Sequence, residues 1–192
     1  WITDPHLNFL EKPEREMFYT QIKQLEVSGV LITGDIAESK DICSLLNEFS
    51  TCLNRPIYFV LGNHDYYFSN VVDVRAKVKK ACFLNKNLTW LGQGDIIQLN
   101  ESTVLVGHDG WADARYGDFD QSMVRINDSR LIGELYQAFL VSKSALKNEM
   151  QKLADADAAS LANTVNKAVD EKIRNVIVAT HVPPFPEGCW HQ

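Results

Sequence analysis

Short apolar runs alternate with longer amphipathic stretches along the first third of the chain. The runs Val30 to Thr33 and Ile57 to Leu61 are rich in β-branched and aromatic residues, which predicts two buried strands. Apolar residues recur at helical spacing before and between them, and Pro13 and Asp41 stand where two helices would begin. Trp1 to Thr3 has the composition of a strand's tail. Strands that alternate with helices in this way predict a parallel sheet with right-handed crossovers.

After a further helix predicted over 71–83, the pattern changes to short strand-like runs. Gly and Asn turns separate three of these runs, which predicts an antiparallel addition to the parallel core. The three runs span residues 88–91, 96–99 and 103–107.

The stretch 113–172 interrupts this succession of strands. Its first part, 113–127, has no period and predicts a long surface loop. Beyond it, apolar residues at helical spacing predict a helix over 128–140 and then a long helix, with a bend or break expected at 155–157. We expect this stretch to form a cap-like insertion, after which 175–180 returns as a buried strand.

Length and composition indicate a globular protein. The chain of 192 residues is long enough for one domain with a substantial core, so we expect a single domain over 1–192. Hydrophobic residues at 45% and charged residues at 23% are typical of this class. No apolar run approaches the roughly 18 residues of a membrane span, so no membrane partner is expected. The net charge of −6 argues against a nucleic-acid partner, but only weakly, because metal-binding carboxylates contribute to it.

The cysteines indicate the cellular compartment, and the first residue indicates whether the sequence begins at the natural start. Cys43, Cys52, Cys82 and Cys189 form no Cys-x-x-Cys pair, which argues against cysteine-bound zinc or a redox motif. A reducing compartment, and hence a cytoplasmic location, is the simpler interpretation. Because the first residue is Trp1 rather than Met, we expect residues to be missing ahead of it.

Polar side chains follow several of the predicted strands at the point where each strand ends. In an open α/β sheet this is the edge where sites are built. A single His there is more often a structural residue, and Asp35 after Gly34 is more often a turn or cap residue. Asn, His and Asp in succession after the strand 57–61 are harder to explain by packing alone. The candidate residues are Asp4, His6, Asp35, Asn63, His64, Asp65 and His181.

These residues form an ordered set of motifs. Asp-x-His at 4–6, Gly-Asp at 34–35 and Gly-Asn-His-Asp at 62–65 precede a strand that ends in His181. The set resembles the calcineurin-like metallophosphoesterase family over nearly the whole chain, and Gly-Asn-His-Asp is its most specific part. The resemblance implies a four-layer α/β/β/α sandwich of mixed sheets. It also implies a two-metal site at its top that hydrolyses a phosphomonoester or phosphodiester.

The resemblance also implies a role for each residue. Asp4 and His6 would hold one divalent metal, Asn63 and His181 would hold another, and Asp35 would bridge the two. Carboxylate, imidazole and amide ligands suit Mn, Fe or Zn. A water between two such metals would lose its proton near neutral pH and attack the phosphorus.

Two adjacent residues would complete the chemistry without binding metal. His64 would act as the general acid that protonates the leaving oxygen. Asp65 would support His64 by favouring its charged form.

One departure from the family pattern concerns the end of the chain. The family normally ends its site with Gly-His-x-His, and nothing after His181 matches, since His191 is followed only by Gln192. We expect the missing ligands to lie beyond Gln192. His108, in Gly-His-Asp at 107–109, comes too early and is interpreted as a rim residue or a turn residue. Trp111 is expected to be a packed aromatic rather than a substrate platform.

Two further classes of function are weighed against the enzyme. A family member with an impaired site could act as a binding or scaffold domain, but the presence of His64 and Asp65 favours catalysis. A nuclease would need a basic groove, which the acidic balance does not support. Family protein phosphatases usually carry Gly-Asn-His-Glu with Arg ahead of it, whereas Leu61 stands here. A small phosphorylated substrate, selected by the cap-like insertion, is therefore expected.

Overall fold

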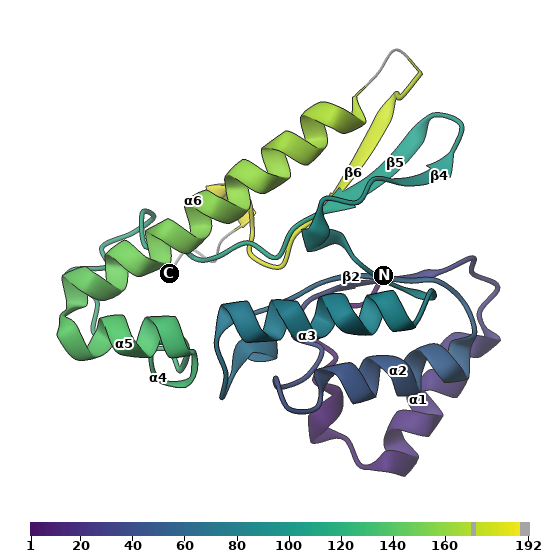
Figure 1. The fold of residues 1–192 in the computed structure, drawn as a ribbon, viewed down its shortest axis with the longest axis horizontal. Coiled ribbons are helices and arrows are strands. Elements are labelled where there is room, and N and C mark those ends of the chain that lie inside the picture. The colour runs from purple at the N-terminus through teal and green to yellow at the C-terminus, as the bar shows by residue number, and fades with distance from the viewer. Residues whose placement is uncertain (170–171, 189–192) are drawn as a thin grey trace.

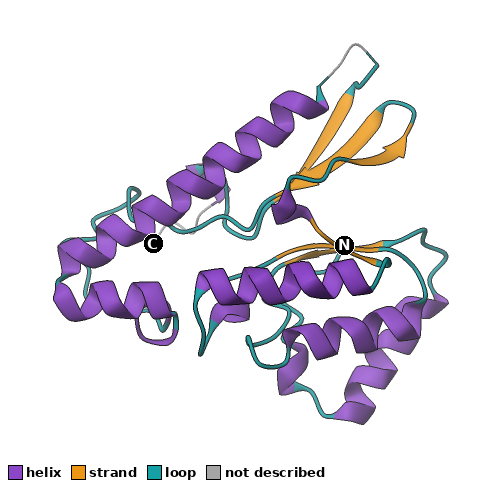
Figure 2. Cartoon of the chain, viewed as in Figure 1, coloured by secondary structure: helices purple, strands orange, loops and turns teal. Residues whose placement is uncertain are grey.

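The computed structural model describes residues 1–169 and 172–188, which form six α-helices and two three-stranded sheets (Figures 1 and 2). The helices are α1 (Lys12–Gln24), α2 (Ile42–Leu53), α3 (Val71–Leu84), α4 (Asp128–Leu131), α5 (Gly133–Val141) and α6 (Lys143–Ala168). The strands are β1 (Val30–Thr33), β2 (Ile57–Val60), β3 (Leu88–Trp90), β4 (Ile97–Asn100), β5 (Thr103–Gly107) and β6 (Asn175–Ala179). Cys189 and His191, considered above, lie outside the described residues.

The first sheet is parallel, with strands in the order β1-β2-β3. The predicted strands at 30–33 and 57–61 are confirmed, and Ile2 forms a parallel bridge with Ile32 beside them. The antiparallel pairing predicted for 88–91 is wrong, because β3 pairs parallel with β2. Helix α3 runs between these two strands and supplies the crossover that a parallel pair requires.

Helices α1, α2 and α3 lie together on one side of the first sheet, below it in Figure 1. The core on this side contains fully buried side chains from the sheet and from the helices, among them Ile32, Phe59, Leu46, Phe49 and Val74. The apolar runs and the helical stripes therefore face one another, as an α/β layer requires.

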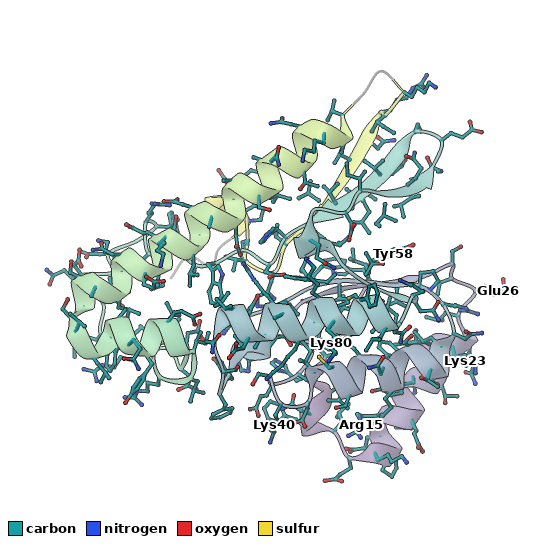
Figure 3. All side chains as sticks on the ribbon, in the orientation of Figure 1. Arg15, Lys23, Glu26, Lys40, Tyr58 and Lys80 are labelled. Carbon is teal, nitrogen blue, oxygen red and sulfur yellow. The ribbon has the colours of Figure 1, made fainter. Side chains whose placement is uncertain are left out.

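The second sheet has the order β4-β5-β6, with β4 antiparallel and β6 parallel to β5. Val60 and Leu91 pack against Leu105 and Ala179 between the sheets, and Tyr58 joins them from β2 (Figure 3). Helix α6 packs against β5 through a separate cluster that contains Val104, Val106 and Ala168. The predicted mixed α/β class is thus confirmed, whereas the complete four-layer order and the single domain over 1–192 stay predictions.

The insertion differs from its predicted form in two places. The helix expected over 128–140 is interrupted by the fully buried Ile132, which is extended and bridges Ser69. The break expected at 155–157 is absent, because α6 continues through it and buries the Asp157 side chain against Arg75.

Two further properties belong to the described part of the chain. The prediction of a buried strand at 175–180 is wrong in its burial, because Ile177 and Val178 of β6 are exposed and Ala179 alone in this strand is buried. Within residues 1–169 and 172–188, no helix combines the length and apolar character that a membrane span would need.

Candidate metal centre

The candidate residues meet around the carboxylate of Asp35, directly after β1. Asp35 is only 5% exposed. Its Oδ2 lies 3.8 Å from His6 Nε2 and 3.9 Å from His64 Nε2. Its Oδ1 lies 3.5 Å from His181 Nε2. Three imidazoles from distant parts of the sequence therefore face one carboxylate. Local secondary structure alone would not bring these side chains together.

The backbone around this carboxylate is strained. Asp4, His6 and Asp35 have positive φ angles of 50°, 41° and 51°. Asp4 N–H donates to Gly34 O at 3.2 Å and His6 N–H donates to Asp35 O at 3.0 Å, so the two loops hold each other in this conformation. A non-glycine residue in the left-handed region costs about 1 kcal/mol or more, and such strain concentrates at functional sites.

Glycine is required where the loops approach His181. Gly34 has a φ of +92°, and a Cβ on it would lie 2.5 Å from His181 Nδ1. A Cβ on Gly62 would collide with the Asp35 carboxylate. The glycines of Gly-Asp and Gly-Asn-His-Asp are therefore explained by the close packing of the polar side chains.

The side chains of Asn63 and His181 each direct an atom with a free lone pair toward the other. His181 Nδ1 donates to the carbonyl oxygen of Thr33 at 2.8 Å, which leaves Nε2 as the atom with the free lone pair. Asn63 Nδ2 donates to Asp128 Oδ1 at 2.8 Å, which turns the Asn63 Oδ1 toward His181. These two acceptors lie 3.2 Å apart. A cation near both atoms, or a second proton on the imidazole, would satisfy them.

His6 and His64 lie side by side at the other oxygen of Asp35. Their ring centroids are 4.8 Å apart with an interplanar angle of 72°. Each presents Nε2 to Asp35, while each Nδ1 is buried without a hydrogen-bond partner among the described residues. The His64 ring is stacked on Tyr67 with centroids 4.2 Å apart, and this contact was not foreseen from the sequence.

The Asp65 carboxylate, which was expected to support His64, accepts hydrogen bonds from backbone N–H groups of two loops. This fully buried carboxylate accepts N–H groups from Ile36, Ala37 and Gly62, each at 2.8 Å. Burial raises the pKa of Asp65 well above its usual value, although these three N–H groups oppose the rise. Asp65 therefore fastens the loop after β1 to the loop after β2, and a catalytic role for it stays a prediction.

The donor atoms fit a divalent metal. One group consists of His6, Asp35 and His64, and the other of Asp4, Asp35 and His181; within each, the ligand atoms lie within 4.8 Å of one another. Asp35 belongs to both groups, as a bridging ligand would. The grouping differs from the predicted one, since Asp4 lies with His181 and His6 with His64. Nitrogen and oxygen donors without thiolate suit Mn, Fe or Zn.

A second cluster of the same residue types lies at the end of β5 and was mostly missed from the sequence. Asp109 is completely buried, and Arg75 Nη2 lies 3.0 Å from Asp109 Oδ2 and 2.7 Å from Asp157 Oδ2. Leu61 N–H and Trp90 Nε1 each donate to Asp109 Oδ1 at 2.8 Å. The Arg75 guanidinium already supplies the positive charge here, so this cluster has no need of a metal.

Histidine and charge complete this second cluster. His108 Nδ1 lies 3.2 Å from Asp157 Oδ2, so the side chain expected at a rim or in a turn is buried in an ion-pair network. Burial raises the pKa of Asp157, but its bonds to His108 and Arg75 outweigh burial and hold the pKa below its usual value. Asp109 O also accepts the N–H of His181 at 3.1 Å, so the network positions the candidate ligand.

A pocket of about 1100 Å³ opens beside the His181 loop. Thr180 and Val182, the neighbours of His181, form one wall, and α6 and the loop 110–119 form others. Trp111 lines it while packing against the Tyr66 ring at 5.2 Å, in agreement with the packed role expected for it. The insertion therefore encloses space next to the candidate metal centre.

Comparison with known proteins bears on the whole chain. A model of the calcineurin-like phosphoesterase family, Metallophos, matches residues 1–192. The crystal structure of phosphopantetheinyl hydrolase (PptH) from Mycobacterium tuberculosis is similar, with a TM-score of 0.66 and 17% sequence identity. The alignment covers 98% of this chain and 69% of that chain, and at this identity the likeness is one of fold. No curated protein sequence matches.

Proposed function

The chain belongs to the calcineurin-like phosphoesterase family, and from this premise we propose that it hydrolyses a small phosphomonoester or phosphodiester at two divalent metals held around Asp35. Hydrolysis of a phosphoric ester is the activity of the family. The particular site, the number of metals and the roles of the residues are the proposal.

The observation that carries the proposal is the sharing of Asp35 between two potential ligand groups. In the assignment that the family resemblance implies, Asp35 would bridge the metals, Asp4 and His6 would hold one, and Asn63 and His181 would hold the other. The ligand atoms themselves lie closer together as Asp4 with His181 and His6 with His64, so the observed groups support Asp35 as the shared ligand and leave the assignment of the other ligands to the test. When bound, two divalent metals would activate a water and neutralise the phosphoryl oxygens.

His64 is proposed as the general acid for the leaving oxygen. Its ring rests on Tyr67 and its Nε2 faces the Asp35 carboxylate, on the side where a substrate's phosphoryl group would approach the metals. A protonated imidazole at this position would donate its proton to the leaving oxygen. Since His64 also lies within reach of a metal beside His6, a test must separate an acid from a ligand.

The alcohol part of the substrate is proposed to lie in the pocket beside His181. That pocket of about 1100 Å³ is lined by apolar side chains such as Met150, Leu161 and Phe185, and by the ring of Trp111. The similar structure bears the name of a phosphopantetheinyl hydrolase, so phosphopantetheine esters belong among the substrates to be tested. Phe185→Ala, which changes the pocket lining and leaves the metal centre and its supporting residues in place, should alter the preference among esters, and unchanged kinetics would count against this placement.

The proposals for the partners and the location rest on composition. The net charge of −6 favours a small phosphorylated substrate over nucleic acid. The scattered cysteines favour a reducing, cytoplasmic location.

Chromogenic phosphomonoesters and phosphodiesters, assayed with the full-length protein, test the proposal. Turnover should require Mn²⁺, stop with a chelator and resume when metal is returned. Asp35→Ala should lower the rate of turnover by about a thousandfold or more. Folded, metal-loaded protein that hydrolyses none of the esters would instead favour a binding or scaffold domain.

A further inference from the structure

One acidic side chain of the insertion forms hydrogen bonds to residues at the candidate metal centre. Asp128, at the first position of α4, is 8% exposed. Its Oδ1 accepts from Asn63 Nδ2 and from the Tyr67 hydroxyl, each at 2.8 Å. These partners lie 65 and 61 residues earlier in the chain, so the contact is a product of the tertiary fold.

The backbone around Asp128 is firmly docked on the segment after β2. Phe68 N–H donates to Leu131 O at 2.8 Å, and Gly133 N–H donates to Ser69 O at 2.8 Å. The extended Ile132 forms the parallel bridge between these two bonds. This explains why the helix predicted over 128–140 is interrupted here, and it fixes the Asp128 carboxylate relative to Asn63.

The contact decides which end of the Asn63 amide faces the metal site. An asparagine side chain has an oxygen that can bind a cation and an NH₂ group that cannot, and the two ends have nearly the same shape. A carboxylate can only accept hydrogen bonds, so Asp128 selects the NH₂ end and turns the oxygen toward His181. If the Asn63 amide were rotated by half a turn, its oxygen would face the Asp128 carboxylate oxygen. Its NH₂ group would then face the metal site, where it cannot bind a cation.

The same carboxylate oxygen holds the residue beneath the proposed acid. The Tyr67 hydroxyl donates to Asp128, and the Tyr67 ring is stacked on His64 at an interplanar angle of 30°. Asn63 Nδ2 also lies 3.3 Å from the Tyr67 oxygen, so the three side chains form one connected group.

We propose that Asp128 is a positioning residue of the metal centre, an inference that rests on the function proposed above. It orients Asn63 for metal binding and supports the His64 ring through Tyr67. The insertion thereby supplies a residue that positions the metal centre, in addition to forming walls of the pocket.

Four variants of the full-length protein, compared by calorimetric titration with Mn²⁺, test this role. Asp128→Ala should weaken Mn²⁺ binding about 10- to 100-fold, the usual effect of removing a partner that orients a ligand. Asp128→Asn should lose less, because its amide oxygen can still accept from Asn63. Tyr67→Phe should bind Mn²⁺ as the wild type does but turn over more slowly. Asp155→Ala, which removes an exposed partner of Arg115 on the same insertion, is the matched control and should bind normally.

A second readout needs neither metal nor activity. In the metal-free wild type, the side-chain NH₂ resonances of Asn63 should show slowed exchange with water, and Asp128→Ala should abolish this protection. Metal-free melting curves of the variants check that the fold is retained.

The outcomes separate the two proposals. Wild-type protein that binds no Mn²⁺ would overturn the proposed function and this inference with it. Mn²⁺ binding by the wild type and equally tight binding by Asp128→Ala would overturn the positioning role alone. Equal losses in Asp128→Asn and Asp128→Ala would also overturn it, because the charge rather than the acceptor oxygen would then matter.

Discussion

Two clusters of histidine and aspartate lie close together in this protein, yet their electrostatics differ. Around Asp35, acceptor atoms of Asn63 and His181 face each other, and among the described residues no Lys or Arg is paired with the Asp35 carboxylate. Around Asp109, a guanidinium lies within 3.0 Å of two carboxylates. Residue types alone would favour a metal in both clusters. The hydrogen-bond donors and charges around each carboxylate favour a metal only at the Asp35 cluster.

The difference also appears in the backbone. The Asp35 cluster is built on residues in strained left-handed conformations, and the Nδ1 atoms of His6 and His64 are buried without a partner in the described part of the chain. The Asp109 cluster is made of side chains whose hydrogen bonds are satisfied by Tyr66, Trp90 and backbone N–H groups. Strain and missing partners therefore favour the Asp35 cluster as the proposed functional site, and saturated hydrogen bonds favour a structural role for the Asp109 cluster.

Among the residues proposed to act without binding metal, removal of the acid His64 should have the largest effect on function. His64→Ala should slow hydrolysis of alkyl phosphoesters by about 100- to 10,000-fold, because a poor leaving group needs the proton. Nitrophenyl esters should be affected far less. The variant's Mn²⁺ affinity, measured by titration, should match that of the wild type; a large loss of affinity would identify His64 as a ligand instead.

Removal of the guanidinium from the second cluster should have the largest effect on stability. Arg75→Ala leaves Asp109 and Asp157 buried without their cation, which should lower the free energy of unfolding by about 3–5 kcal/mol. Urea denaturation of the metal-free protein measures this. A loss below about 1 kcal/mol would mean that the network is no more important than a surface ion pair.

The pH dependence of stability should reflect Asp157. Its pKa in the folded protein is depressed by His108 and Arg75, so its contribution is fully present above the unfolded value of about 3.9 and is lost as pH falls through the folded value. Unfolding free energies measured from pH 6 down to pH 2 should therefore fall less steeply for Asp157→Asn than for the wild type. Parallel curves for the two proteins would exclude this coupling.

Surface pairs in the insertion should matter least. Arg115 lies 2.7 Å from Asp155 and 2.9 Å from Asp113, where all three side chains are exposed to solvent to a substantial degree. Arg115→Ala should change the melting temperature slightly at low salt and not at all at high salt, since screening removes such interactions. A loss that persists at high salt would show that the loop depends on Arg115 for packing.

The sequence allowed part of the Asp35 cluster to be predicted because Asp35 and Asn63 follow neighbouring strands of a parallel sheet. Once 30–33 and 57–61 are recognised as neighbouring strands, Asp35 and Asn63 must lie at one edge. The second cluster could not be predicted in the same way. Arg75 and Asp157 are 82 residues apart and meet only through the tertiary fold, which no local pattern encodes.

Other errors have the same origin. A helical pattern over 128–140 gave no sign of the break at Ile132, because the break serves a contact with the segment after β2. The partners of Asp65 are backbone N–H groups, which every residue except proline offers, so a sequence cannot single them out. Local periodicity therefore predicted most elements, and long-range hydrogen bonds decided the rest.

The most direct test of the central claim is an anomalous diffraction experiment on crystals of the full-length protein grown with Mn²⁺. Our account predicts manganese peaks on either side of the Asp35 carboxylate, about 3.5–4 Å apart, and none among His108, Asp109 and Asp157. A manganese peak in the Asp109 cluster, or no peak beside Asp35, would contradict it.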